Sequence, residues 1–347
     1  MKLDSPFAYF GGKKKIAAKV WERLGDPPNY VEPFFGSGAM LLQRPQIGKI
    51  ETVNDKDGFI SNFWRSIQHD PEQTAYYADN PVNENDLHAR HSWLLGQKES
   101  IVSKLEGDME YYDCKIAGWW VWGMACWIGG GFCSGNGPWV VNNGELINGG
   151  MGGINRKRVH LSSSQGISRK RAHLSTSQGI NRQRVQLSGG NGVKRISLKN
   201  DGIYNWFESL AIRLKDVRVC SGDWSRICGP SPTWQLGMTG VFLDPPYSTS
   251  ERDDGLYCTD SMTVAKDVLR WCIDNGDNPL LRIALCGYEG EHVLPESWEV
   301  LHWRAHGGYG LLGDARGREN RHKETIWFSP ACLKASEQTF WNMAKGE

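Results

Sequence analysis

The segment Val31-Glu32-Pro33-Phe34-Phe35-Gly36-Ser37-Gly38-Ala39-Met40 limits the possible folds of this chain more than any other. It has the pattern of a strand end, a glycine loop and a helix start, because the residues from Ala39 onward are apolar and favour helix. Gly36 and Gly38 permit a tight turn that brings the backbone close to a nucleotide-like ligand, and the helix start offers N–H donors to a carboxylate. Another β-like run ends in Asp55, where doubly wound folds place a carboxylate for ribose hydroxyls. We therefore predict a doubly wound α/β fold.

A second motif, Asp244-Pro245-Pro246-Tyr247, follows the apolar run Val241-Phe242-Leu243. These residue types suit the binding of a planar amine. Asp244 can accept one hydrogen bond, and the carbonyl of Pro245, held at a fixed φ, can accept a second. Tyr247 offers a face on which a base can stack. Taken alone, the tetrapeptide is explained equally well as a turn between a strand and a loop.

Three further motifs complete an ordered set. Phe7-Ala8-Tyr9-Phe10-Gly11-Gly12-Lys13 joins aromatic residues, two glycines and a lysine in one loop, although a basic surface turn also explains it. Asn54-Asp55 and Gly222-Asp223-Trp224 follow later in the chain. The order F-x-G-G-K, E-P-F-x-G-x-G, N-D, G-D-W and D-P-P-Y resembles that of the Dam-like DNA adenine methyltransferases.

The resemblance implies a Rossmann-like core that uses S-adenosylmethionine to methylate adenine N6 in double-stranded DNA, after the base has flipped out. Its donor-binding residues would be Tyr9, Lys13, Glu32, Pro33, Phe34, Phe35, Gly36, Ser37, Gly38, Asp55, Asp223, Trp224 and Asp244. Within this set, Lys13 and residues 33–38 would surround the methionine part, Asp55 the ribose, and Asp223 with Trp224 the adenine. The catalytic residues would be Asp244, Pro245, Pro246 and Tyr247. Tyr9 stands where many family members have tryptophan.

Other substrates and another class of protein remain open. Cytosine N4, RNA adenine and a protein glutamine amide are also planar amines, and chemistry alone does not exclude cytosine. A catalytically inert DNA-binding protein is the alternative outside the enzymes. Near the carboxyl terminus, Arg318-Glu319-Asn320 and Lys323-Glu324-Thr325-Ile326-Trp327 resemble the closing strand of the family, and a plain edge strand explains them equally well.

The predicted domains are a methyltransferase core at residues 1–57 and 201–347 and a target-recognition insertion at 58–200. Within the insertion, residues 60–105 have the pattern of helices. Trp120, Met124 and Trp127 recur at helical spacing, which predicts a helix packed on the core and ended by the glycines at 129–131.

Residues 153–198 form a basic repeat whose units begin at Gly153, Gly166, Gly179 and Gly192, 13 residues apart. Each unit alternates apolar and polar residues, which favours a short strand over a helix, either stacked or extended. From 146 to 200 there are eleven basic residues and no acid, so the remainder of the chain carries a formal charge of −10. Contact with DNA phosphates is the favoured role, and a soluble charged spacer is the alternative. The arginines predicted to bind DNA are Arg156, Arg158, Arg169, Arg171, Arg182 and Arg184.

Composition excludes several other classes of protein. The chain has no apolar run of about 18 residues and no signal-peptide pattern, so we predict a cytoplasmic protein with no membrane contact. Its nine cysteines include no C-x-x-C pair, and its histidines lack ligand spacing. We therefore expect reduced thiols and no metal site.

Overall fold

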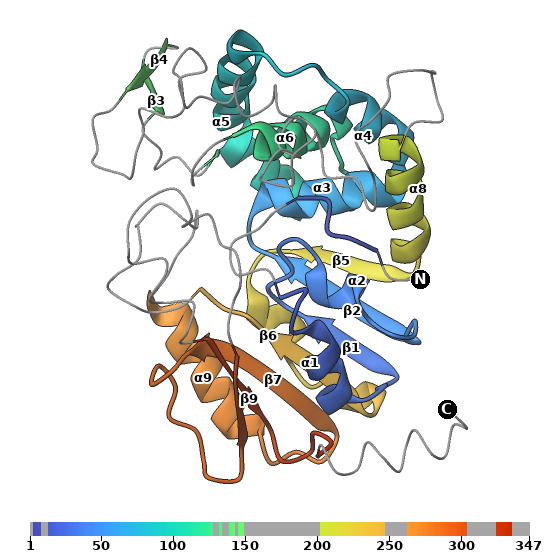
Figure 1. Cartoon of the computed structure of the whole chain (residues 1–347), viewed down its shortest axis with the longest axis vertical. Coiled ribbons are helices and arrows are strands. Elements are labelled where there is room, and N and C mark those ends of the chain that lie inside the picture. Colours follow the sequence, from blue (N-terminus) through green and yellow to red (C-terminus); the bar gives the residue numbers. More distant parts are fainter. Residues whose placement is uncertain are drawn as a thin grey trace.

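A seven-stranded sheet lies in the lower part of the molecule as drawn in Figure 1. The computed structural model describes residues 3–7, 13–127, 132–133, 139–142, 145–148, 202–246, 262–303 and 324–334. The strands of the sheet are β1 (Asn29–Glu32), β2 (Ile50–Asp55), β5 (Val217–Ser221), β6 (Thr239–Leu243), β7 (Leu281–Tyr288), β8 (Glu299–His302) and β9 (Glu324–Phe328). They lie in the order β5-β2-β1-β6-β7-β9-β8.

The first five strands of that order are parallel, and β9 runs antiparallel to both of its neighbours. This mixed α/β sheet confirms the predicted Rossmann-like fold. Strand β9 lies between β7 and β8, so the alternative interpretation of residues 323–327 as an edge strand was wrong. All five of its residues are buried.

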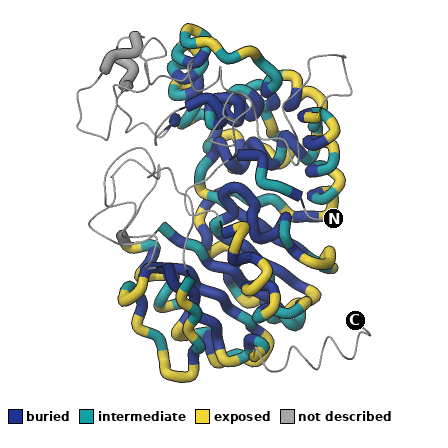
Figure 2. Tube along the Cα trace, viewed as in Figure 1, coloured by how far each residue is buried: buried dark blue, intermediate teal, exposed yellow. Residues whose placement is uncertain are grey.

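Apolar side chains alternate between the two faces of the sheet, as the strand repeat requires. Tyr30 and Phe242 pack in one core with α1 (Ala17–Leu24). Val31 and Val241 pack in a second core with α9 (Met262–Asn275). Helices therefore cover both faces, which is why β1 and β6 are buried along their whole length (Figure 2).

The strand order reverses beside β1. From β1 the chain passes through the short helix α2 (Ala39–Leu42) to β2 on one side, whereas β6 lies on the other. Val31 is the register partner of both Thr52 and Val241. Open α/β sheets bind ligands at the carboxyl ends of strands at such a point. The glycine loop follows β1 and Asp244-Pro245-Pro246 follows β6, so both lie at this reversal.

Helices of the central part of the chain gather beyond the β5 edge of the sheet, at the top of Figure 1. They are α3 (Gly58–His69), α4 (Pro71–Ala78), α5 (Glu84–Gly107), α6 (Cys114–Cys126) and α8 (Gly202–Leu214). Strands β3 (Trp139–Asn142) and β4 (Glu145–Asn148) pair as an antiparallel hairpin. Although α8 falls outside the predicted insertion, it packs against α3 and α4. The boundaries 58–200 remain a prediction.

Helix α6 is the most apolar of these helices and lies at their centre. Trp120 and Trp127 are buried and Met124 is half-buried, which confirms the predicted packing. The helix begins at the side-chain cap Asp113, which accepts a hydrogen bond from the Ile116 N–H, and it ends at Cys126. Residues 129–131, predicted to end it, lie outside the described residues.

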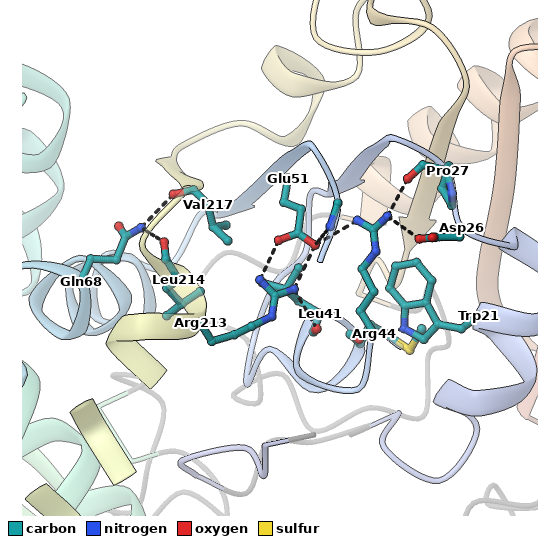
Figure 3. Close-up of polar contacts among 12 residues, drawn as sticks. Trp21, Asp26, Pro27, Leu41, Arg44, Glu51, Gln68, Arg213, Leu214 and Val217 are labelled. Carbon is teal, nitrogen blue, oxygen red and sulfur yellow. Dashed lines mark hydrogen bonds and ion pairs between the residues drawn. The ribbon is translucent and has the colours of Figure 1, made fainter. Parts of the chain in front are cut away.

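A buried ionic cluster joins α8 to the sheet (Figure 3). Glu51 of β2 accepts hydrogen bonds from Arg213 of α8 at 2.6 and 2.9 Å. It also accepts one from Arg44 at 2.9 Å. Gln68 of α3 donates to the carbonyls of Leu214 and Val217, which ties the end of α8 to the start of β5. Helix α8 is thus connected to β2 by the ion pair of Arg213 with Glu51.

The basic repeat at 153–198 and its predicted DNA-binding arginines lie outside the described residues. Within the described ranges, every helix is too short or too polar to cross a bilayer. The eight cysteines of those ranges are free thiols, and no three His, Cys, Asp or Glu side chains there are grouped as metal ligands.

Candidate active site

The glycine loop after β1 is hydrogen-bonded to the end of β2. The Phe35 N–H donates to the Asn54 carbonyl at 2.9 Å. The Gly36 N–H donates to a carboxylate oxygen of Asp55 at 2.8 Å. Both contacts require β1 and β2 to be neighbours, because they cross from the loop after one strand to the end of the other. The loop is therefore a fixed part of the sheet edge.

Trp64 of α3 supports the same loop from the helical side. Its Nε1 donates to the Gly36 carbonyl at 2.9 Å. Gly38 has φ +69°, and a Cβ there would lie 3.0 Å from both Phe35 and Trp64. Glycine is required at this position by both conformation and space. As predicted, a helix begins directly after Gly38, although α2 is only four residues long.

Asn54 connects the glycine loop with the loop that contains Asp223. Its Nδ2 donates to the Pro33 carbonyl at 3.2 Å and to the Gly222 carbonyl at 2.9 Å. The side chain is 1% exposed, so these hydrogen bonds form away from water. Sequence reasoning recognised the N-D pair but gave a role only to its acid. An amide side chain at the end of a β-like run, next to that acid, was the available signal.

Asp55 accepts backbone hydrogen bonds with both carboxylate oxygens. One binds the Gly36 N–H and the other the Asp57 N–H, at 2.8 and 2.9 Å. Burial and the nearby charge of Asp57 raise the pKa of Asp55 to about 7, against the effect of these donors. The residue predicted to hold a ribose thus also positions the glycine loop.

Asp223 and Trp224 follow β5 at the same edge. The carboxylate of Asp223 accepts from the Ser225 N–H at 3.0 Å, and the hydrogen bond from the Ser225 hydroxyl lowers its pKa. Trp224 is nearly buried, and its ring lies 6.1 Å from that of Phe34 with 27° between the planes. Phe34 is half-buried. The two loops therefore share an aromatic contact.

Lys13, the last residue of the F-x-G-G-K motif, forms an ion pair with Asp244, the first residue of the D-P-P-Y motif. Its Nζ lies 2.9 Å from Asp244 Oδ2 and 3.6 Å from Glu324 Oε2. The Lys13 side chain is 3% exposed and that of Asp244 20%. Burial disfavours the charged amine, but the attraction of both carboxylates outweighs it, so the pKa of Lys13 lies above its ordinary value.

Beside this ion pair lies Glu32, the last residue of β1. It is 2% exposed and accepts a hydrogen bond from the Tyr30 hydroxyl at 2.9 Å. Burial raises the pKa of Glu32 well above its usual range; the Tyr30 hydrogen bond works in the opposite direction, and the charge of Asp244 adds to the rise. Burial therefore favours the neutral form of Glu32.

The structure brings most of the predicted site residues to one edge of the sheet. Pro245 is buried and Pro246 half-buried beside Asp244, and Ser37 is buried in the glycine loop. Tyr9 and Tyr247 lie outside the described residues. Sequence reasoning missed Asn54, Trp64 and Glu324. Glu324 had been assigned to a strand only, and nothing local distinguishes it from an ordinary strand residue.

The strand order, with motif-bearing loops at the carboxyl ends of β1, β2, β5 and β6, is that of a Rossmann-like fold. Residues 9–99 match the family of D12 class N6 adenine-specific DNA methyltransferases. The match confirms the resemblance drawn from the motifs and the prediction of an enzyme. It includes Lys13, the glycine loop and Asp55, and the D-P-P-Y motif lies beyond it. No curated protein matches the chain.

Proposed function

We propose that this enzyme transfers the methyl group of S-adenosylmethionine to N6 of a flipped-out adenine at specific sites in double-stranded DNA. The contact between Lys13 and Asp244 carries the proposal, because it joins the F-x-G-G-K loop to the D-P-P-Y motif. Both lie at the strand-order reversal next to the glycine loop. A donor and a base would need to meet at such a place.

The side chains at this edge suit the proposed donor. S-adenosylmethionine, when bound, supplies a methyl group on a positively charged sulfur. Carboxylates at Asp223 and Asp244 favour a cation, and the aromatic pair Phe34 and Trp224 offers apolar surface to a purine. Gly36 and Gly38 leave room for the backbone to approach it.

Asp244 and Pro245 would hold the acceptor nitrogen. The lone pair of the adenine amine is delocalised into the ring, so acceptors that bind its two N–H groups favour a pyramidal nitrogen. The Asp244 carboxylate and the Pro245 carbonyl provide two acceptors. As the bond from nitrogen to the methyl carbon forms, the carbon–sulfur bond breaks, and the nitrogen then releases one proton to water, directly or through Asp244. Alignment of the groups contributes most of the rate.

The basic repeat supports a DNA substrate. Its arginines and lysines would neutralise phosphates and release counterions, a contribution that does not depend on sequence. The remainder of the chain is acidic, so we assign DNA backbone contact to residues 153–198. The family match favours DNA adenine over the other planar amines.

Transfer of labelled methyl groups tests the proposal. The purified chain is mixed with tritiated S-adenosylmethionine and unmethylated duplex DNA, and the DNA is digested to nucleosides. Label in N6-methyladenine is expected. Asp244→Asn should retain donor affinity and lose most of the transfer rate. Label in N4-methylcytosine, or in RNA alone, would replace the proposed substrate, and DNA binding with no transfer would favour the inert protein.

A further inference from the structure

The side chain of Asn54 joins two loops that follow different strands. Its Nδ2 donates to the Pro33 carbonyl, in the glycine loop after β1, at 3.2 Å and to the Gly222 carbonyl, after β5, at 2.9 Å. Strand β2, which contains Asn54, lies between β1 and β5. An amide NH2 group has two hydrogens, so one nitrogen serves both carbonyls. The position of one side chain therefore sets the spacing of the two loops.

We propose that Asn54 is a positioning residue for the methyl donor, which holds the methionine-binding and adenine-binding loops at the spacing that S-adenosylmethionine requires. This role rests on the proposed function. Residues 33–38 would surround the methionine part of the donor, and Asp223 with Trp224 would flank its adenine. The two ends of one donor molecule would thus contact the two loops that Asn54 connects.

Burial strengthens the two hydrogen bonds of the Asn54 amide. Asn54 is 1% exposed, so water competes little for its side chain. Each loop also has a backbone attachment to β2, because the Phe35 N–H donates to the Asn54 carbonyl at 2.9 Å and the Gly222 N–H to the Asp55 carbonyl at 3.2 Å. These backbone contacts do not involve the Asn54 side chain. Its removal should therefore loosen the spacing of the loops and leave the sheet intact.

A fixed spacing raises the affinity for a ligand that spans both loops. When the loops already stand at the correct distance, the donor does not have to order them as it binds. Contact with one loop then places the rest of the donor at the other, as in the binding of two linked ligands. A ligand that contacts one loop alone gains little from the spacing. The affinity for the whole donor should therefore depend on Asn54 more than the affinity for a fragment of it.

Asn54→Ala tests this role by calorimetric titration. S-adenosylhomocysteine is the first probe, because it has both ends of the donor and no methyl group to transfer. We expect its dissociation constant to rise about 10-fold, the effect of losing one or two buried hydrogen bonds. The second probe, 5′-methylthioadenosine, lacks the amino-acid end of the donor, and its dissociation constant should rise less than about threefold. An equal rise for both probes would overturn the proposal.

Asn29→Ala is the matched control. Asn29 is also a buried asparagine of the sheet, and it begins β1, at the opposite end of that strand from the glycine loop. Its Nδ2 donates to the Pro232 carbonyl and to the Thr239 hydroxyl, both at 2.9 Å. Asn29→Ala should lower the free energy of unfolding about as much as Asn54→Ala, yet leave both dissociation constants within about twofold. The same rise in the control would show that lost stability weakens binding and would refute the role of Asn54.

Steady-state kinetics gives an independent readout. A bound donor restores the spacing of the loops, so kcat with saturating donor and DNA should stay within about threefold in Asn54→Ala, while the KM for the donor rises. A large fall in kcat with unchanged donor affinity would assign Asn54 to the chemical step and would also overturn the proposal.

The outcomes separate this inference from the proposed function. If the unaltered enzyme methylates DNA adenine and Asn54→Ala binds S-adenosylhomocysteine equally tightly, the role of Asn54 is wrong and the function stands. If the enzyme methylates another acceptor and Asn54→Ala weakens S-adenosylhomocysteine binding as expected, the role stands and the proposed acceptor is wrong. If the unaltered enzyme binds no S-adenosylhomocysteine, both are wrong.

A second variant decides if Asn54→Ala fails to fold. Asn54→Ser keeps a polar side chain, but a hydroxyl has one hydrogen and cannot serve both carbonyls. Asn54→Ser should therefore also weaken S-adenosylhomocysteine binding more than it weakens 5′-methylthioadenosine binding. Unchanged binding of S-adenosylhomocysteine by this variant would overturn the proposal.

Discussion

Replacing Glu51 by glutamine should destabilise the protein more than any exposed ion-pair change. The Glu51 side chain is 3% exposed and accepts from Arg44 at 2.9 Å and from Arg213 at 2.6 and 2.9 Å. Glutamine keeps one acceptor oxygen but no charge, so two buried guanidinium groups would face each other without their shared carboxylate. Breaking a buried pair in this way costs about 3 to 5 kcal/mol, and the remaining acceptor favours a loss of about 3 kcal/mol.

Urea unfolding followed by tryptophan fluorescence and far-ultraviolet circular dichroism measures the change. With a slope of about 3 kcal/mol per molar urea, a loss of about 3 kcal/mol lowers the midpoint by about 1 M. Asp274→Asn is the control, because Asp274 and Arg270 lie 3.9 Å apart with side chains 63% and 84% exposed. That change should stay within about 0.5 kcal/mol.

A double-mutant cycle with Arg213→Gln tests the pairing directly. Once Glu51 is glutamine, the second change removes one of the two facing charges, so the double variant should be more stable than the sum of the single losses implies. We expect a coupling energy of about 1 to 3 kcal/mol. Additive losses, or a Glu51→Gln loss as small as that of Asp274→Asn, would refute the reasoning.

Three other expectations follow from the structure. Gly118→Ala should lower the free energy of unfolding by about 1 to 3 kcal/mol in the same urea assay, because the added Cβ would lie 2.7 Å from the Thr74 carbonyl oxygen. Gly96→Ala should raise the free energy of unfolding by about 0.5 to 1 kcal/mol, because the space around Gly96 is open. Burial lowers the pKa of His91 to about 4, so the neutral side chain contributes fully to the free energy of unfolding above pH 6.5. As the pH falls from 6.5 to 4, the free energy of unfolding should decrease by up to about 1.4 kcal/mol per pH unit. Urea titrations at several pH values should show a flatter pH dependence for His91→Gln. Deleting residues 153–198 should weaken DNA binding and flatten its dependence on salt with donor affinity unchanged, and equal salt slopes for the two proteins would reject the phosphate contact.

Local sequence was enough where a structural requirement is local. The glycines at 36 and 38 predicted the turn after β1, because few other residues adopt its backbone conformation. The spacing of Trp120 and Met124 predicted a helix packed on the core, since side chains at that spacing lie on one face. The order of the motifs indicated a class of enzyme, although each motif alone had an ordinary structural explanation.

Contacts between distant parts of the chain were decided by the tertiary structure alone. Asn54 can reach Pro33 and Gly222 only because β1 and β5 flank β2, and strand order is not encoded in any one strand. Lys13 lies near Glu324 because β9 is placed between β7 and β8. A register shift of one residue would turn the Glu324 side chain to the other face of the sheet. The sequence by itself determined which loops and residue types are present, and the packing of the sheet decided which charged groups meet, because local patterns contain no information about neighbours far away in the chain.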